Sequence, residues 1–309
     1  MSFRRILVPT DFSRHADQAA ELALSIAERD GAELVLLHVS PMPDYAMLAV
    51  EPMYLPPKLW DRLWDRECSQ IQLKLDALAQ QLHAVGKGTA EITKIYRRGN
   101  PVTQILEVAE GLDIDLIALG SQGADGTLRY LFGGVAGKVA REAPCPVLVA
   151  PPEAPRRAPR NALVAVDYSK FSAPAAEVAL AAVGDAGDIT CLHVWRHPPV
   201  RGWEPFSEFA EAVEQVRHGA VAHLDEFAAD LAMRDRNVGK RIEVGSPAQG
   251  ILDSAREIRA DLIVLGAHSR HGVERIIGTV ADRVLRQAEV AVLMVPERAL
   301  EDRKVRSVA

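Results

Sequence analysis

The stretch GSQGADGTLRYLFGGV, residues 120–135, decides how this sequence is interpreted. It follows the apolar run Leu116–Leu119 and precedes a helical pattern that begins at Val135. Glycine adopts positive φ angles at little cost and lets another group approach the backbone closely. The N-terminus of a helix adds unpaired N–H groups and a partial positive charge, which suit an anion. The segment is therefore a candidate phosphate-binding loop, although the same glycines would also serve simply to turn the chain.

An internal repeat spans almost the whole chain. The segment RRILVPTDFSRHADQAAELAL from Arg4 matches RNALVAVDYSKFSAPAAEVAL from Arg160, and this alignment pairs Asp11 with Asp167. Further matches follow in the same order: LLHV with CLHV, GNP with GSP, DLIALG with DLIVLG, and CPVLVAP with VAVLMVP. The sequence therefore predicts a duplicated domain.

Proline placement sets the predicted domain boundaries. The segment PPEAPRRAPR, residues 151–160, is rich in proline, which continues neither a helix nor a central strand. We predict a first domain over residues 1–151, a short semi-rigid linker over 152–159 and a second domain over 160–296. Residues 297–309 are charged and lie beyond the last predicted strand, so we expect a solvated helical tail or a frayed end there.

Apolar runs and helical patterns alternate along the first half. Short apolar runs bounded by turn residues predict strands, and Ser13 and Asn100 are predicted N-caps. The predicted strands are 4–9, 33–39, 90–97, 114–119 and 146–150, and the predicted helices are 13–31, 59–86, 101–110 and 135–142. The strands are apolar throughout rather than alternating, so this order predicts an α/β fold in which each half is an open five-stranded parallel sheet with helices on both faces.

The predicted topology places the two candidate site segments at one edge of the sheet. Ligands of open α/β sheets bind beyond the carboxyl ends of the strands, where the strand order switches direction. If the first and fourth strands are neighbours there, Asp11 and the glycine loop face the same crevice.

Composition narrows the class of protein. The chain has 309 residues, of which 48% are hydrophobic and 25% charged, which fits about two folded domains. A net charge of −6 gives no global reason to bind nucleic acid or an anionic membrane. The three cysteines are far apart, so we expect reduced thiols and a cytoplasmic protein. We expect neither a spanning helix nor a signal peptide, because the apolar runs are too short.

Together these motifs resemble the universal stress protein (UspA-like) family in its tandem, two-domain form. The resemblance rests on ILVPTDFS, on the closing CPVLV, and on a loop in which Gly120-Ser121-Gln122-Gly123 is followed by nine residues and Gly133. It covers nearly the whole chain. It implies two tandem Rossmann-like domains, a role in the stress response, and binding of ATP, with Mg²⁺ as an accompanying ion. It also implies that the fifth strands, at Val147–Val149 and Val292–Val295, pair across a pseudo-twofold axis.

The resemblance also implies nucleotide contacts at the matching positions. Asp11, the Pro9-Thr10 backbone and Val39 would contact adenine or ribose, while main-chain groups of the glycine loop would line the ribose and phosphates. The first-domain candidates are Pro9, Thr10, Asp11, Val39, Leu119, Gly120, Gly123, Gly133, Gly134 and Val135. The second-domain candidates are Val166, Asp167, Val194, Gly266, Ser269, Gly278, Thr279 and Val280.

Each half departs from the family pattern at a different place. Gly134 stands where ATP-binding members have serine or threonine, which removes a hydroxyl worth roughly 0.5–3 kcal/mol as a phosphate donor. In the second half Thr279 keeps the hydroxyl, but Ser269 replaces the middle glycine and only eight residues separate it from Gly278. Serine is strained at positive φ, and its Cβ would narrow the path of the phosphates. We therefore predict that the nucleotide site lies chiefly in the first half.

Some candidate residues have simpler explanations. Asp11 and Asp167 would also be favoured as acids at a helix N-terminus. His38 and His193 end equivalent apolar strands, and we predict hydrogen-bonded, partly buried imidazoles rather than catalytic ones.

Other segments predict structural roles. His268 and His271 have no obvious third ligand nearby, so no metal site is predicted. The segment Met42–Met53 is predicted to be a lid or a packing surface. Trp60 and Trp64 are predicted to bury their rings against the core or a partner.

The sequence shows no nucleophile–base pair and no acid–base carboxylate pair. The leading hypothesis is a nucleotide-binding stress protein that signals by binding and not by turnover. One alternative is a nucleotide-independent interaction protein, whose halves form a pseudo-dimer that dimerises further or binds another protein. The other is an enzyme related to ATP-pyrophosphatases or adenylyltransferases, or a slow ATPase, but the SGGxDS and HxGH motifs of such enzymes are absent from the sequence.

Overall fold

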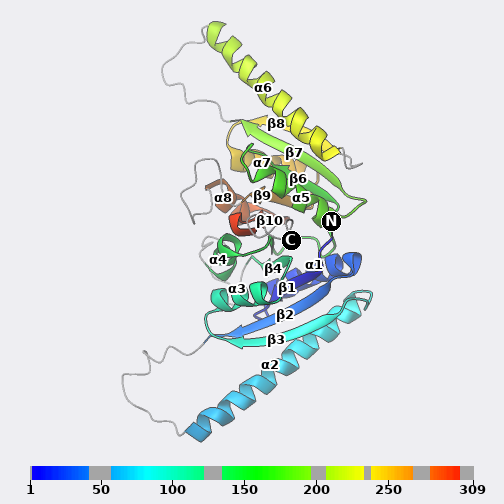
Figure 1. Cartoon of the computed structure of the whole chain (residues 1–309), viewed down its shortest axis with the longest axis vertical. Coiled ribbons are helices and arrows are strands. Elements are labelled where there is room, and N and C mark those ends of the chain that lie inside the picture. Colours follow the sequence, from blue (N-terminus) through cyan, green and yellow to red (C-terminus); the bar gives the residue numbers. More distant parts are fainter. Residues whose placement is uncertain are drawn as a thin grey trace, which may run out of the picture.

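The computed structural model describes residues 2–41, 57–121, 134–195, 207–232, 238–266 and 279–299 (Figure 1). Within these ranges, the side chains of residues 57–64, 207–214, 216, 232 and 279 are outside the description. The segment 42–53, the rings of Trp60 and Trp64, and both His268 and His271 therefore lie outside the described residues.

Nine elements form the first repeat, the half that ends near residue 151. They are β1 (Arg5–Pro9), α1 (Arg14–Asp30), β2 (Glu33–Ser40), α2 (Pro57–Val85), β3 (Ile92–Arg98), α3 (Pro101–Gly111), β4 (Leu116–Gly120), α4 (Val135–Glu142) and β5 (Val147–Ala150). The second repeat has the same order among its described residues. Its elements are β6 (Asn161–Ala165), α5 (Ser172–Val183), β7 (Asp188–Trp195), α6 (Ser207–Ala232), β8 (Val238–Val244), α7 (Pro247–Glu257), β9 (Leu262–Gly266), α8 (Thr279–Gln287) and β10 (Ala291–Val295).

The strands form one continuous sheet in the order β3-β2-β1-β4-β5-β10-β9-β6-β7-β8. Neighbouring strands are parallel within each repeat, whereas β5 and β10 are antiparallel, with Leu148 opposite Leu293. The predicted pairing of the fifth strands is therefore confirmed, and so is the predicted α/β fold class. The molecule is elongated, with α2 beside the outer strand β3 at one end and α6 beside β8 at the other (Figure 1).

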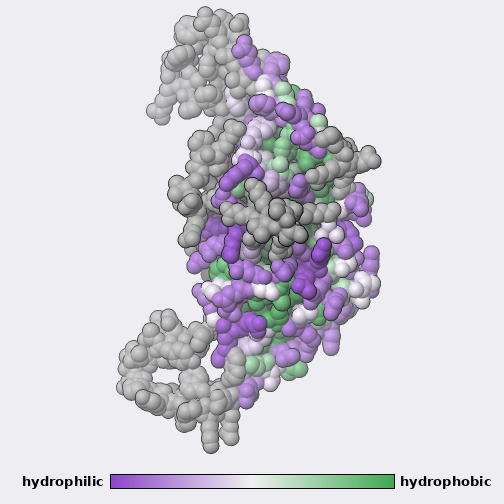
Figure 2. Space-filling view, viewed as in Figure 1, coloured by the Kyte–Doolittle hydropathy of each residue, from purple (hydrophilic) through white to green (hydrophobic). Residues whose placement is uncertain are grey.

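Two hydrophobic cores lie on opposite faces of this sheet. Ile6 and Val8 of β1 belong to the core that includes α1, α2, α5 and α6. Leu7, between them, belongs to the core that includes α3, α4, α7 and α8. Successive side chains of a strand point to opposite faces, so an apolar strand serves both cores. The face drawn in Figure 2 is largely hydrophilic, with hydrophobic residues in narrower patches between the polar ones.

Helix ends follow the predicted caps. The Ser13 side chain accepts a hydrogen bond from the Ala16 N–H, and α1 ends at Gly31 with φ 68°. The Asn100 side chain accepts from the N–H groups of Val102 and Thr103 at the start of α3.

Two strands, β3 at Ile92 and β4 at Leu116, begin two residues later than predicted. The predicted β4 start at residue 114 is wrong because residues 112–114 close α3. Asp113 has φ 51°, and the Ile114 N–H donates to the Ala109 carbonyl at 3.0 Å. This bond reverses the chain before the strand begins.

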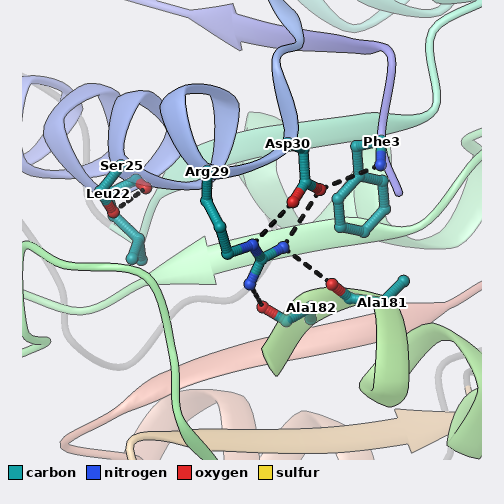
Figure 3. A network of polar contacts seen from close by, with 7 residues as sticks. All are labelled: Phe3, Leu22, Ser25, Arg29, Asp30, Ala181 and Ala182. Atoms are coloured by element: carbon teal, nitrogen blue, oxygen red, sulfur yellow. Dashed lines mark hydrogen bonds and ion pairs between the residues drawn. The ribbon is translucent and has the colours of Figure 1, made fainter. Parts of the chain in front are cut away.

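A guanidinium group from α1 contacts a helix end in the second repeat (Figure 3). Arg29 donates through Nη2 to the Ala181 carbonyl at 2.8 Å and through Nη1 to the Ala182 carbonyl. Asp30 holds the Arg29 side chain at 2.7 Å and also accepts from the Phe3 N–H at 3.0 Å. The last carbonyls of a helix carry partial negative charge, so the cation stabilises the end of α5 and joins the repeats.

The connecting segment also lies against α1. The Gln18 Nε2 donates to the Pro152 carbonyl at 2.6 Å, and the Arg156 Nη1 lies 3.0 Å from both carboxylate oxygens of Glu21. After β10 the chain forms a helical turn in which Ala299 is buried, and residues 300–309 lie outside the description. None of the helices in the described ranges is both long and apolar enough to cross a membrane.

Candidate functional site

The strand order switches direction between β1 and β4. From β1 the chain continues to β2 on one side, whereas β4 pairs with the other side of β1. All three strands are parallel, so their carboxyl ends share one edge of the sheet. The predicted condition is confirmed: Asp11 follows β1, Gly120 ends β4, and both flank the position where ligands bind in such sheets.

The turn after β1 is fixed by its own polar groups. Thr10 donates its N–H to the Leu37 carbonyl at 2.8 Å, and its hydroxyl oxygen accepts from the Phe12 N–H at 3.0 Å. Asp11 Oδ1 accepts from the Ser13 N–H at 3.0 Å. Thr10 is buried and Asp11 exposed, so the turn carries the Asp11 carboxylate on the surface at the strand end.

Phe12 follows Asp11 with φ 61°, in the left-handed region. This region is uncommon for a bulky side chain and costs about 1–2 kcal/mol relative to the right-handed conformation. The equivalent Tyr168 of the second repeat has φ 57°. Both repeats therefore hold an aromatic residue in the same unfavourable conformation, directly after the candidate aspartate.

Gly120 has a structural cause within the described residues. A Cβ at this position would lie 2.8 Å from the backbone C and O atoms of His15 in the first turn of α1. Such contacts are too short, so glycine is needed for α1 to pass close to the end of β4. The packing of α1 thus accounts for Gly120 without a ligand.

The helix after the glycine loop begins at a cap that lacks a side chain. Gly134 is the N-cap of α4 with φ −73° and ψ −165°, and it makes no side-chain cap hydrogen bond. A Cβ built on Gly134 meets nothing within 4 Å among the described residues. The first N–H groups of α4 thus receive no cap from Gly134, and such groups suit an anion. Residues 122–133, which include Gly123 and Gly133, lie outside the described residues.

The remaining first-repeat candidates differ in exposure. Pro9 and Leu119 are buried at the ends of β1 and β4, Val39 is half-buried in β2, and Val135 is exposed at the start of α4. The side chains of Pro9 and Leu119 therefore pack in the core and only position the backbone. The side chains of Val39 and Val135 are accessible to solvent.

The second repeat holds its aspartate differently. Asp167 Oδ1 accepts from the Ser169 N–H at 2.9 Å and from the Ser172 hydroxyl at 3.0 Å, and the Ser172 hydroxyl accepts from the Asp167 N–H at 3.2 Å. The aligned residue in the first repeat is Ala16, which has no hydroxyl. Ser172 was not among the predicted site residues, although the aligned sequences do contain this difference.

The other second-repeat candidates are only partly described. Val166 is buried, while Val194, Gly266 and Val280 are half-buried at the ends of β7 and β9 and the start of α8. Ser269, Gly278 and the side chain of Thr279 lie outside the described residues.

The two histidines form equivalent hydrogen bonds. His38 Nδ1 lies 2.8 Å from the Thr10 carbonyl oxygen, and His193 Nδ1 lies 2.8 Å from the Val166 carbonyl oxygen. A carbonyl only accepts, so Nδ1 carries the proton in both rings. The predicted hydrogen-bonded, partly buried imidazoles are confirmed.

Negative charge gathers at the start of α1. Burial raises the pKa of Asp17, the nearby Glu21 and Asp11 raise it further, and Arg156 lowers it. This arrangement favours hydrogen-bond donors over anions beside Asp11, in contrast to the start of α4. In the described ranges no three His, Cys, Asp or Glu side chains are grouped so as to hold a metal ion.

Comparisons with known proteins agree with the duplicated architecture. A universal stress protein of Mycobacterium tuberculosis, Rv2005c, is 27% identical over 298 residues, which cover 94% of this chain and 96% of that protein. A shorter universal stress protein of Thermus aquaticus is 33% identical over 148 residues, which cover 48% of this chain and 98% of that protein. The crystal structure of a universal stress protein from Archaeoglobus fulgidus has the same fold, with a TM-score of 0.70, 23% identity, and coverage of 96% of this chain and 97% of that one.

The family model itself matches both repeats. The model of the universal stress protein family covers residues 2–151 and again residues 159–296. These two matches, together with the strand order and the relatives of both lengths, establish that the chain belongs to the universal stress protein family.

Proposed function

We propose that this protein binds an adenine nucleotide, ATP, at the carboxyl edge of the first repeat, and acts in the cytoplasmic stress response by binding rather than by turnover. One observation carries the proposal. The switch between β1 and β4 places the exposed Asp11 carboxylate and the end of β4 on one edge, and α4 begins on that edge because it runs back to the parallel strand β5.

The two ends of the site suit different parts of a nucleotide. A carboxylate accepts hydrogen bonds from ribose hydroxyls or the adenine amino group, which is the role proposed for Asp11. The N–H groups that open α4 suit the phosphates, because Gly134 supplies no capping side chain. An accompanying Mg²⁺ would be held mainly by the phosphates and water, as is usual for this ion.

The second repeat is proposed to be the structural half of the pseudo-dimer. Each aspartate accepts the N–H of the serine two residues later, but only Asp167 also accepts a hydroxyl, that of Ser172, where the first repeat has Ala16. A ligand that recruits Asp167 would compete with these internal bonds. We therefore propose one nucleotide per chain.

A titration of ATP against matched variants tests the proposed site. The wild type should bind ATP, and Asp11→Ala should weaken binding about 10- to 100-fold, as for lost hydrogen bonds to a charged group. Asp167→Ala should bind like the wild type. Absence of ATP affinity in the wild type would overturn the proposal, and equal losses in both variants would overturn the assignment to the first repeat.

The alternative is a protein-interaction module that needs no nucleotide. Gly120 supports it, because the close packing of α1 explains this glycine without a bound phosphate. It predicts that a partner binds equally well with and without ATP, and equally to Asp11→Ala. Turnover is checked separately, because multiple rounds of ATP hydrolysis at saturating ATP would show that the protein does more than bind.

A further inference from the structure

We propose that His38 is a positioning residue for the nucleotide site, because its ring fixes the carbonyl immediately before Asp11. The inference rests on the proposed ATP site in the first repeat. It assigns to His38 a function beyond stabilising β2, namely setting where the Asp11 carboxylate stands relative to the ligand.

A hydrogen bond from His38 fixes the Thr10 carbonyl. His38 lies near the carboxyl end of β2, and its Nδ1–H donates to the Thr10 carbonyl oxygen at 2.8 Å. The Thr10 N–H donates to the neighbouring Leu37 carbonyl at 2.8 Å. Both backbone polar groups of Thr10 are thus held by consecutive residues of β2. The last peptide before Asp11 therefore cannot rotate without breaking one of these bonds.

Neighbouring side chains hold the His38 ring in place. The Phe12 ring stacks on the His38 imidazole with centroids 4.6 Å apart, and the Tyr96 ring lies 6.1 Å from it. The Ser40 hydroxyl lies 3.5 Å from His38 Nε2. Stacked rings and a second polar contact restrict the imidazole, so its Nδ1–H presents a fixed donor.

Both neighbours of Asp11 in the chain contact the His38 ring. The chain around it is fixed on one side by the hydrogen bonds of Thr10 and on the other by Phe12, whose left-handed φ of 61° is unfavourable. The stacking of Phe12 on His38 helps to hold this conformation. Asp11 therefore lies between two residues that both contact one imidazole. Loss of the Nδ1–H releases the Thr10 carbonyl, whereas loss of the ring, which is common to both substitutions tested below, removes the stacking of Phe12.

The second repeat contains the same arrangement and serves as an internal control. His193 Nδ1 lies 2.8 Å from the Val166 carbonyl oxygen, and Tyr168 lies 4.6 Å from the His193 ring. Asp167 there has the additional bond to Ser172. A change at His193 should thus carry a comparable structural cost without reaching the proposed ATP site.

The test uses two conservative substitutions in the full chain. In His38→Asn the side-chain amide N–H can take the place of Nδ1–H, whereas in His38→Gln the amide reaches toward the position of Nε2. We expect His38→Asn to bind ATP within about twofold of the wild type and His38→Gln to bind about 3- to 10-fold more weakly, as for one lost hydrogen bond. His193→Gln should keep wild-type affinity while losing thermal stability to a similar degree as His38→Gln.

The outcomes separate the two proposals. Titrations are made well below the melting temperature of each variant, with folding checked by circular dichroism. Wild-type affinity in both His38 variants, equal losses in both, or an equal loss in His193→Gln would each overturn the positioning role while leaving the ATP site in place. Failure of the wild type to bind ATP would overturn both.

Discussion

Gly134 leaves the candidate site without the hydroxyl that serine or threonine would supply, and the described residues leave space for such a side chain. It caps α4 without a side chain, and a Cβ there meets nothing within 4 Å among the described residues. We expect Gly134→Ser to strengthen ATP binding about 2- to 10-fold, because the new hydroxyl can donate to a phosphate oxygen. Calorimetric titration with ATP measures the change.

Gly134→Ala is the matched control for this substitution. It adds the Cβ without the hydroxyl, so its ATP affinity should not rise, and as an N-cap it should be somewhat worse than glycine. If serine and alanine changed the affinity equally, the hydroxyl would have no part in binding and the phosphates would lie elsewhere.

Single residues also mark the limits of prediction from the sequence. The position of Asp11 just beyond the end of β1 was predictable, because an apolar strand followed by a turn is a local pattern. The cause of Gly120 was not, because the backbone that excludes a Cβ belongs to His15, more than a hundred residues earlier. Ser172 was visible in the aligned repeats, but its bond to Asp167 depends on where α5 begins.

At the scale of elements, Tyr168 ties the turn after β6 to α6. Its hydroxyl donates to the Ala220 carbonyl at 3.0 Å, and burial raises the pKa of Tyr168 from 10 to about 12. The folded state thus favours the neutral phenol. The resulting stability is complete below pH 10, the value for the unfolded chain, and is lost as the pH rises from 10 toward 12.

Tyr168→Phe should therefore be less stable than the wild type at pH 8, by about 0.5–1.5 kcal/mol for the lost hydrogen bond. The difference should shrink between pH 10 and 12, because only the wild type loses this contribution. Burial also raises the pKa of Cys191 to about 12. The loss of stability at high pH that comes from Cys191 is therefore common to the wild type and Tyr168→Phe. Urea unfolding at pH 8, 10 and 11 measures this, and a constant gap would contradict it.

The end of α5 depends on Arg29 of the other repeat. Arg29→Met keeps much of the apolar stem but removes the donors to Ala181 and Ala182, and should cost about 1.5–3 kcal/mol of unfolding free energy. Arg256→Met is the control, since Arg256 is about half exposed and pairs with Asp253 and Glu289 at the surface, where a loss of about 1 kcal/mol or less is expected. Equal denaturant midpoints for the two variants would show that the contact with α5 adds nothing.

Elements were more predictable than the contacts between them. Ser13 and Asn100 cap their helices through bonds only two or three residues long, which a local pattern determines. The contact of Arg29 with α5 joins residues more than 150 positions apart. No spacing rule in the sequence predicts this contact, because Arg29 reaches α5 only when the pairing of β5 with β10 brings the two repeats together.

For the whole molecule, the seam between β5 and β10 decides the assembly. All residues of Val147–Ala150 are buried, and three of them pair with β10. A chain of residues 1–159 would expose this strand, so we expect it to dimerise through β5 while the full chain keeps the edge paired internally. Analytical ultracentrifugation of the shortened chain measures this, and a stable monomer at micromolar concentration would contradict it.

The number of ATP molecules bound per chain tests the central proposal most directly. Equilibrium dialysis of the full-length protein against saturating ATP counts them without relying on any variant. One nucleotide per chain is the predicted result, since the Ser172 hydroxyl binds the Asp167 carboxylate in the second repeat, whereas the first repeat has Ala16 at the matching position. Two per chain would contradict the difference between the repeats, and none would contradict nucleotide binding itself.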